Sequence, residues 1–148
     1  MPPEEWGPPI WILFHTLCYK IKPEYFSQYG KELFLFIFRI CCNLPCPECS
    51  QHAKQFLAKV SVSSLKVKED LINILYIFHN SVNQRKRKEL FSFENINDYE
   101  KRDIKNVYNQ FIQVFHTRGN MNLLTESFQR GMLVKQFKAW LTKNHQIF

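Results

Sequence analysis

Two prolines in three residues, Pro45 and Pro47, interrupt a sequence that otherwise predicts long helices. Proline lacks a backbone N–H and its ring clashes with the preceding turn, so a helix that approaches Leu44 has to end there. Proline is well tolerated at the first position of a helix, and a new helix is therefore expected to begin at Pro47. The chain has only four glycines and seven prolines in 148 residues. Because so few residues break helices, helices are favoured over a sheet with many turns.

Apolar residues recur at helical spacing along most of the chain, which predicts an all-α fold. We expect helices over residues 10–19, 25–42, 47–59 and 69–84, followed by amphipathic segments over 93–115 and 121–143. The residues able to carry chemistry all precede about residue 100. The sequence therefore predicts a functional domain over residues 1–100 and a helical C-terminal extension over residues 101–148.

Composition and charge exclude several classes of protein. Apolar residues make up 45% of the chain, too many for a disordered protein. Four scattered glycines supply no glycine-rich loop for phosphate, which excludes P-loop and Rossmann sites. The start of the chain shows no secretory signal, and the longest apolar stretch, residues 33–38, is too short to span a membrane. We expect a soluble, intracellular protein whose net charge of +7 attracts phosphate-bearing ligands.

The segment Cys46-Pro47-Glu48-Cys49 is the strongest chemical signal. If Pro47 opens a helix, Cys46 is its N-cap and Cys49 lies one turn further on. The free N–H groups and the positive dipole end of that helix would stabilise a Cys46 thiolate, the form of cysteine that exchanges disulfides. The two-residue spacing also lets both sulfurs close into one small disulfide. These features favour a redox role.

A zinc site is the alternative interpretation, because one CxxC also supplies half of a four-ligand site. The sequence has no second CxxC and no histidine pair at zinc-finger spacing. A small helical zinc-binding interaction module that uses the CxxC therefore stays open as the alternative function. The other cysteines, Cys18, Cys41 and Cys42, lie in apolar helical runs, where cysteine fills core space as a small hydrophobe.

Three histidines, His15, His52 and His79, lie on predicted helix faces beside other candidate site residues. Their neighbours at helical spacing are Trp11, Cys18 and Tyr19 on the first helix, Cys49 and Phe56 on the third, and Val82, Asn83 and Lys86 on the fourth. The last group suits a flat ligand that carries phosphate, although a hydrogen-bonded place in the core is the commoner role for any one histidine. A CxxC that does more than shuffle disulfides also needs an electron acceptor, and a bound flavin would supply one.

Three segments, in order and at similar separations, resemble the motifs of the Erv/augmenter-of-liver-regeneration family of FAD-linked sulfhydryl oxidases. Residues 7–15 (GPPIWILFH) are similar to the family's G-x-x-x-W-x-x-L-H, with Phe14 where leucine is usual. Residues 44–52 (LPCPECSQH) resemble Y-P-C-x-x-C-x-x-H, and residues 79–83 (HNSVN) match H-N-x-V-N. The resemblance spans about residues 6–99. The compact, cysteine-poor chain resembles the family members encoded by large DNA viruses.

The resemblance implies a four-helix bundle plus a short fifth helix that binds FAD without a covalent bond, usually as a homodimer. It assigns catalysis to Cys46 and Cys49, with Cys49 nearest the flavin and Cys46 exchanging with substrate. The cofactor-binding residues that it implies are Gly7, Trp11, His15, Tyr19, His52, His79, Asn80, Val82, Asn83, Lys86, Lys88 and Tyr99. Lys86 and Arg87 stand where the family has Leu-Gly, so the resemblance leaves open whether Lys86 or Lys88 contacts FAD.

The implied activity is thiol oxidation. A substrate dithiol would attack the Cys46–Cys49 disulfide at Cys46 and leave oxidised through a mixed disulfide. The freed Cys49 thiolate would reduce FAD, and oxygen would reoxidise the flavin to give hydrogen peroxide. The expected partners are a protein dithiol substrate or a thioredoxin-like redox partner, and oxygen, with no nucleic acid, membrane or metal. A virus-encoded protein of this kind is expected in the host cytoplasm or the virion.

Large apolar side chains in the C-terminal extension need a partner, which we expect to be the core or a second subunit. They are Phe111, Phe115, Leu123, Leu124, Phe128, Leu133, Phe137 and Trp140. A separate basic cluster at residues 85–88 is expected to be a solvated helix end that complements the helix dipole, not a nucleic-acid site.

Overall fold

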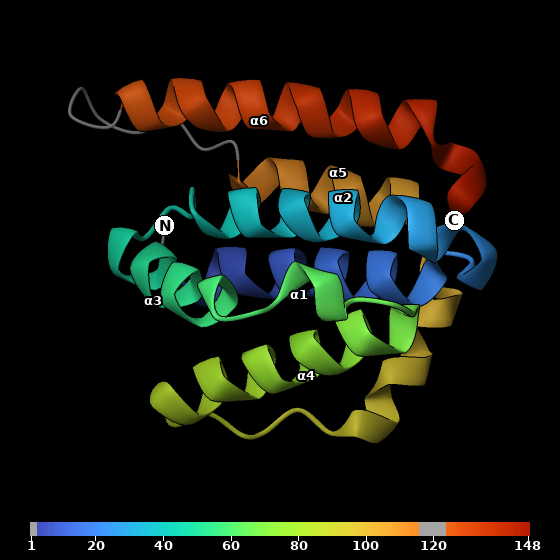
Figure 1. Cartoon of the computed structure of the whole chain (residues 1–148). Helices are drawn as coiled ribbons and strands as arrows, with labels where there is room; N and C mark the ends of the chain where they lie inside the picture. Colours follow the sequence, from blue (N-terminus) through green and yellow to red (C-terminus); the bar gives the residue numbers. More distant parts are fainter. Residues whose placement is uncertain (1–2, 116–123) are drawn as a thin grey trace.

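The computed structural model describes residues 3–115 and 124–148, which contain helices and no strand (Figure 1). The longer helices are α1 (Pro3–Lys20), α2 (Pro23–Cys41), α3 (Pro47–Ala58), α4 (Lys68–Arg85), α5 (Ile104–Phe115) and α6 (Leu124–Lys143). The 3-10 helices are η1 (Val62–Ser64), η2 (Phe93–Lys101) and η4 (His145–Ile147). The all-α class predicted from the sequence is confirmed, and η2 stands in the place of the short fifth helix.

Helix α1 begins at Pro3, seven residues before the predicted start at residue 10. Pro8 and Pro9 lie inside the helix, where each removes one backbone hydrogen bond and crowds the preceding turn. The helix nevertheless continues through both residues, since the φ of proline is itself helical. The consequence matters for the site, because Trp6 and Gly7 lie on the same helix as Trp11.

The chain breaks between α2 and α3 at the two prolines, Pro45 and Pro47, as predicted. Helix α2 ends at Cys41, α3 starts at Pro47, and Cys46 is the N-cap of α3. The backbone N–H of Leu44 donates to the hydroxyl of Ser50 at 2.8 Å, which ties the loop back onto the first turn of α3.

The segment predicted as one amphipathic stretch over residues 93–115 is instead η2 followed by α5, and that part of the prediction is wrong. The side chain of Asp103 accepts a hydrogen bond from the backbone N–H of Asn106 at 3.3 Å. Aspartate in this position is an N-cap, which starts a new helix rather than continuing the old one. The 3-10 geometry of η2 brings Tyr99 and Arg102, three residues apart, to the same side.

Helices α5 and α6 share the hydrophobic core of the first four helices. Phe111, Phe115 and Phe137 are at most 1% exposed, as are Leu13 and Leu17 of α1. Figure 1 shows α6 lying alongside α5 and α2 on one side of the molecule. The expected packing of the extension against the core is therefore confirmed for these residues.

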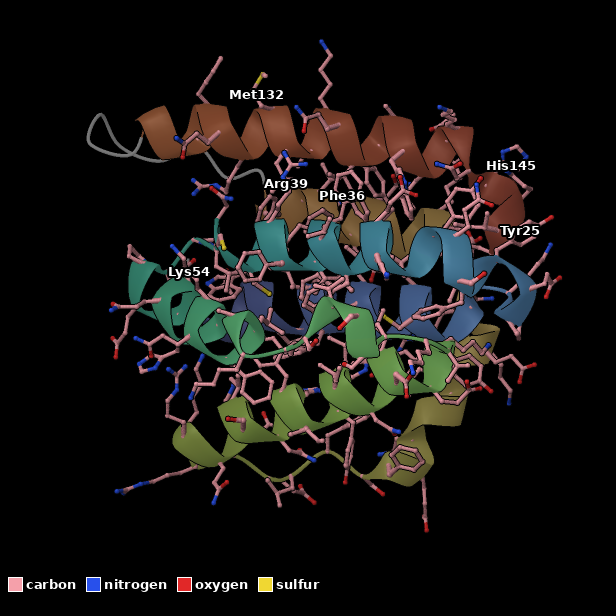
Figure 2. The ribbon with its side chains drawn as sticks, viewed as in Figure 1. Tyr25, Phe36, Arg39, Lys54, Met132 and His145 are labelled. Carbon is pink, nitrogen blue, oxygen red and sulfur yellow. A yellow bond between two sulfur atoms is a disulfide. The ribbon has the colours of Figure 1, made fainter. Side chains whose placement is uncertain are left out.

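Helix α6 is held on α2 by both apolar and polar contacts (Figure 2). The ring centroid of Phe36 lies 5.2 Å from that of Phe137 and 5.3 Å from that of Trp140. The Arg39 guanidinium donates to the side-chain oxygen of Gln136 at 2.6 Å.

Not every apolar side chain of the extension takes part in this packing. Phe128 is 70% exposed and therefore does not pack against the core of this chain. The other expected partner, a second subunit, stays a prediction for Phe128. The predicted break at residues 118–120, Leu123 and the side chain of Leu124 lie outside the described residues. None of the described helices is both long and apolar enough to cross a membrane.

Candidate functional site

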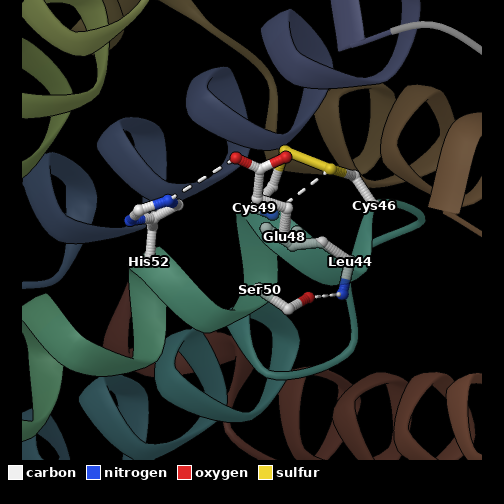
Figure 3. The surroundings of a disulfide bond; sticks show 6 residues. All are labelled: Leu44, Cys46, Glu48, Cys49, Ser50 and His52. Carbon is white, nitrogen blue, oxygen red and sulfur yellow. Dashed lines mark hydrogen bonds and ion pairs between the residues drawn. A yellow bond between two sulfur atoms is a disulfide. The ribbon is translucent and has the colours of Figure 1, made fainter.

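Cys46 and Cys49 form a disulfide at the N-terminus of α3 (Figure 3). The Cys46 sulfur accepts a hydrogen bond from the backbone N–H of Cys49 at 3.2 Å, and both residues are half-buried. The predicted N-cap is confirmed. A thiolate at Cys46 would face the free N–H groups of the helix, an arrangement that stabilises negative charge.

His52 lies near the disulfide in sequence but points away from the protein interior. Its Nε2 atom is 3.8 Å from the carboxylate of Glu48, and the two side chains are 44% and 84% exposed (Figure 3). His52 lines a hollow of about 200 Å³ together with Lys59 and Arg85. An exposed pair of this kind contributes little to stability.

A larger cavity of about 420 Å³ lies between the start of α1, the end of α4 and the end of η2. Its wall contains Trp6, Gly7, Pro8, Ile10, Trp11, Ile12, Phe14, Cys41, Leu44, Ala53, Phe78, His79, Val82, Asn83, Lys86, Lys88, Tyr99 and Arg102. Most residues that the resemblance implies for the cofactor are in this wall. The disulfide is adjacent, because Ala53 follows Cys49 by one turn of α3 and Leu44 precedes Cys46 by two residues.

One wall of the cavity is a stack of aromatic rings. The rings of Trp11 and His79 are nearly parallel, 9° apart, with centroids 4.1 Å apart. His15 lies behind them, with its Nε2 atom 3.0 Å from Nδ1 of His79. Such a hydrogen bond needs one ring nitrogen to donate and the other to accept, which is possible when both rings are neutral.

Both histidines are held neutral at ordinary pH. Burial, and to a lesser extent a charge on His79, lower the pKa of His15 to about 3. Burial, and then the positive charge of Lys88, lower the pKa of His79 to about 4. The wall is therefore an uncharged aromatic surface on which a flat ring can stack.

Three cations lie around the same cavity. Lys86 and Lys88 both line it, so the structure brings together the two lysines between which the resemblance could not choose. Arg102, just after η2, lines it as well and was missed. Its spacing of three residues from Tyr99 would have indicated it, had η2 been predicted as a 3-10 helix.

Arg87 sets the turn between the two lysines. Its φ of 56° lies in the left-handed region that favours glycine. The backbone N–H of Arg87 donates to the carbonyl of Gln84 at 3.1 Å, and that of Lys88 donates to the carbonyl of Asn83 at 2.8 Å. This pair of bonds is a Schellman C-cap, so the chain makes with arginine the turn for which the family uses glycine.

Two further residues implied by the resemblance lie outside the cavity wall. The Lys68 ammonium lies 5.4 Å over the ring of Tyr19 and donates to its carbonyl at 2.8 Å, beside a second hollow of about 670 Å³. The side-chain amide of Asn80 is hydrogen-bonded to the backbone of Phe91. His15 and His52 are not in the cavity wall either, and contacts of any of the implied residues with a cofactor stay predictions.

The wall of the cavity fits a flat, phosphate-bearing ligand such as FAD. Trp6 is 5% exposed, and its indole Nε1 has no hydrogen-bond partner within the described structure, which leaves a donor for a ligand acceptor. A Cβ atom added at Gly7 would meet no described atom within 4 Å, so the protein's own packing does not require glycine there. Aromatic rings for stacking and the three cations for phosphate complete the match. Trp6 was also missed, since the helix was predicted to start after it.

The described residues offer no ligand set for the alternative zinc site. Within residues 3–115 and 124–148, no group of three or more His, Cys, Asp or Glu side chains is arranged to hold a metal ion. Cys18 and Cys41 are buried as predicted, and burial raises the pKa of each thiol. Cys42 was predicted to fill core space, and that prediction is wrong. It is half-buried, because it is the C-cap of α2 at the edge of the core.

Known proteins with similar sequences include FAD-linked enzymes. The model of the Erv1 / Alr family matches residues 8–102 of the chain. An FAD-linked sulfhydryl oxidase of African swine fever virus is 30% identical over 109 residues, which cover 72% of this chain and 82% of the relative. A probable FAD-linked sulfhydryl oxidase of fowlpox virus is 32% identical over 82 residues, which cover 55% of this chain and 78% of the relative. No solved structure gives a significant match.

Proposed function

The chain belongs to the Erv1 / Alr family, and on that basis we propose that it is an FAD-linked sulfhydryl oxidase that forms disulfides in protein substrates. The observation that carries the proposal is the position of the Cys46–Cys49 disulfide, one helical turn before Ala53 in the wall of the cavity. A dithiol exchanger and a site that fits a flat redox cofactor are thus adjacent in one core.

The chain's own residues divide the work of holding FAD. Trp11 and His79 present uncharged ring faces for stacking, and Trp6 offers an unused N–H donor. Lys86, Lys88 and Arg102 supply positive charge for the pyrophosphate. When bound, FAD accepts two electrons from a thiol pair and delivers them to oxygen.

The Cys46–Cys49 disulfide carries out the exchange with substrate. A substrate thiolate attacks the Cys46 sulfur, which forms a mixed disulfide and releases Cys49 as a thiolate. The second substrate thiolate then attacks its partner sulfur in the mixed disulfide, so the substrate leaves as a disulfide and Cys46 leaves as a thiolate. The backbone N–H of Cys49, already 3.2 Å from the Cys46 sulfur, stabilises that leaving thiolate. The substrate has lost two electrons, and the Cys46–Cys49 pair has gained them.

The test is spectroscopic and then kinetic. Purified protein is expected to be yellow, to release FAD on denaturation, and to consume oxygen with dithiothreitol while producing hydrogen peroxide. Cys46→Ser and Cys49→Ser should keep the flavin spectrum and lose oxygen consumption. Cys42→Ser is the matched control, since Cys42 is a free, half-buried cysteine four residues before Cys46, and it should behave as wild type. A folded, colourless protein that gains no colour with added FAD would refute the proposal.

The physiological partner is proposed on chemistry alone. We infer a protein dithiol, either the final substrate or a thioredoxin-like carrier, because the exchange needs two thiols that can close into one disulfide. A homodimer and a location in the host cytoplasm or virion, both implied by the family resemblance, stay predictions that size-exclusion chromatography and fractionation can test.

A further inference from the structure

The side chain of Asn80 is committed to the backbone of one distant residue. Its Nδ2 donates to the carbonyl of Phe91 at 3.0 Å, and its Oδ1 accepts from the N–H of Phe91 at 2.7 Å. The two bonds join α4 to the irregular segment that connects α4 to η2, across eleven residues. A side-chain amide that is hydrogen-bonded to both the N–H and the carbonyl of one residue fixes the distance and the orientation of that residue's backbone.

The ring of Phe91 lies behind the aromatic wall of the cavity. Its centroid is 5.1 Å from that of His79 and 5.2 Å from that of His15, with interplanar angles of 21° and 24°. His79 in turn stacks on Trp11 at 4.1 Å. Trp11 and His79 line the cavity, whereas Phe91 and Asn80 do not belong to its described wall. A continuous series of contacts therefore leads from the Asn80 amide through Phe91 to the cavity surface.

We infer that Asn80 is a positioning residue for the cofactor: it fixes the backbone of Phe91, and the Phe91 ring holds His79 in the cavity wall, both directly and through His15 behind it. Asn80 acts on FAD through Phe91 and does not touch it. This inference rests on the proposed function, because the wall it concerns is the wall proposed to bind FAD. It differs from the direct role that the family resemblance implies for Asn80.

A double-mutant cycle separates the indirect role from a direct one. Asn80→Ala removes both bonds to Phe91, and Phe91→Leu keeps both backbone bonds but removes the ring from the stack. Each single change is expected to raise the dissociation constant of FAD roughly tenfold, because the His79 ring is then held less firmly in the cavity wall. If Asn80 acts through Phe91, the double variant should bind FAD no more weakly than the weaker single variant, because coupled residues are not additive.

The opposite outcome is equally clear. If Asn80 contacts FAD directly, the two effects multiply and the double variant loses roughly a hundredfold in affinity. Asn73→Ala is the control, because Asn73 is an exposed asparagine seven residues earlier on α4 and should leave the affinity unchanged. If Asn80→Ala does not fold, Asn80→Asp replaces it in the same cycle, since the aspartate still accepts from the Phe91 N–H but cannot donate to its carbonyl.

A second readout distinguishes positioning from mere stabilisation. The visible absorption bands of bound flavin report its immediate surroundings, so both single variants, saturated with FAD, should show the same shift from the wild-type spectrum. Unchanged spectra with weaker binding would overturn the inference. A folded wild-type protein that binds no FAD would overturn the proposed function and this inference together, whereas multiplicative effects in a chain that binds FAD would overturn this inference alone.

Discussion

Replacing Gly7 by alanine should make the protein more stable and the cofactor site weaker. Gly7 lies inside α1, where glycine is less favourable than alanine by about 1 kcal/mol. A Cβ at this position would meet no described atom within 4 Å, so no clash offsets the gain. The free energy of unfolding of the FAD-free protein should therefore rise by about 1 kcal/mol, which corresponds to a melting temperature higher by about 2–4 °C.

The same methyl group should impair binding, because Gly7 lines the cavity. Overfilling a packed contact costs about 1–3 kcal/mol, and the dissociation constant of FAD should therefore rise by roughly 5- to 150-fold. The two effects are measured separately, by thermal unfolding without FAD and by fluorescence titration with FAD. A Gly7→Ala protein that binds FAD with wild-type affinity would show that the cavity is not the FAD site. A Gly7→Ala protein that is less stable than wild type would show that the helix does not begin at Pro3.

Gly30 provides the matched control on α2. A Cβ at Gly30 would lie 2.6 Å from ring atoms of Phe26, a side chain that is only 1% exposed. Gly30→Ala gains the same helix propensity but forces a buried ring to move, so it should destabilise the protein by about 1–3 kcal/mol while leaving the cavity wall untouched. Opposite signs of stability change in two helical glycines would confirm the packing that the structure describes.

Three further predictions follow from the end of α4, the histidine pair and the extension. Arg87→Gly should raise the free energy of unfolding in urea by up to ~1 kcal/mol. A left-handed backbone costs a non-glycine residue roughly 1–2 kcal/mol, and the extra chain entropy of glycine in the unfolded state cancels only part of this. A less stable Arg87→Gly protein would contradict the left-handed C-cap at this position. Unfolding free energy should fall as pH drops from about 6.5 toward 4, because unfolded histidines bind protons that buried His15, with a pKa of about 3, and His79, with a pKa of about 4, do not; the fall should be smaller in His15→Gln. Deleting residues after Glu100 should abolish cooperative unfolding, since Phe111 and Phe115 are fully buried in the shared core; a truncated chain that unfolds cooperatively and binds FAD would refute this.

Local chemistry made one half of the site predictable. The N-cap position of Cys46 follows from Pro47 alone, because a proline at the first helical position and a preceding cap are properties of adjacent residues. The same spacing allows a Cys46–Cys49 disulfide, although it also left half of a zinc site open as the alternative. Neither feature depends on how distant segments pack, and the structure reproduces both.

The other half of the site depends on packing that no local pattern encodes. The cavity combines Trp6 near one end of the chain with Arg102, which follows η2. Asn80 reads locally as a polar residue beside a histidine, yet its partners are the N–H and carbonyl of Phe91 in a segment without periodicity. The sequence motif therefore identified the right helix face but could not say which of its side chains face the cavity and which brace the wall.

Helix α1 explains why the extension and the cofactor site belong to one structure. Trp6, Gly7 and Trp11 of this helix line the cavity, whereas Leu13 and Leu17 are buried in the core that α5 completes. A thiol oxidase has conflicting needs, since its exchanging sulfur must reach a protein substrate while its flavin must lie in a dry, fixed pocket. Here the disulfide occupies the half-exposed start of α3, and the pocket wall is built on a helix buried from several sides. The C-terminal helices thus help to keep the pocket wall rigid, because removing them would expose α1, the helix on which that wall is built.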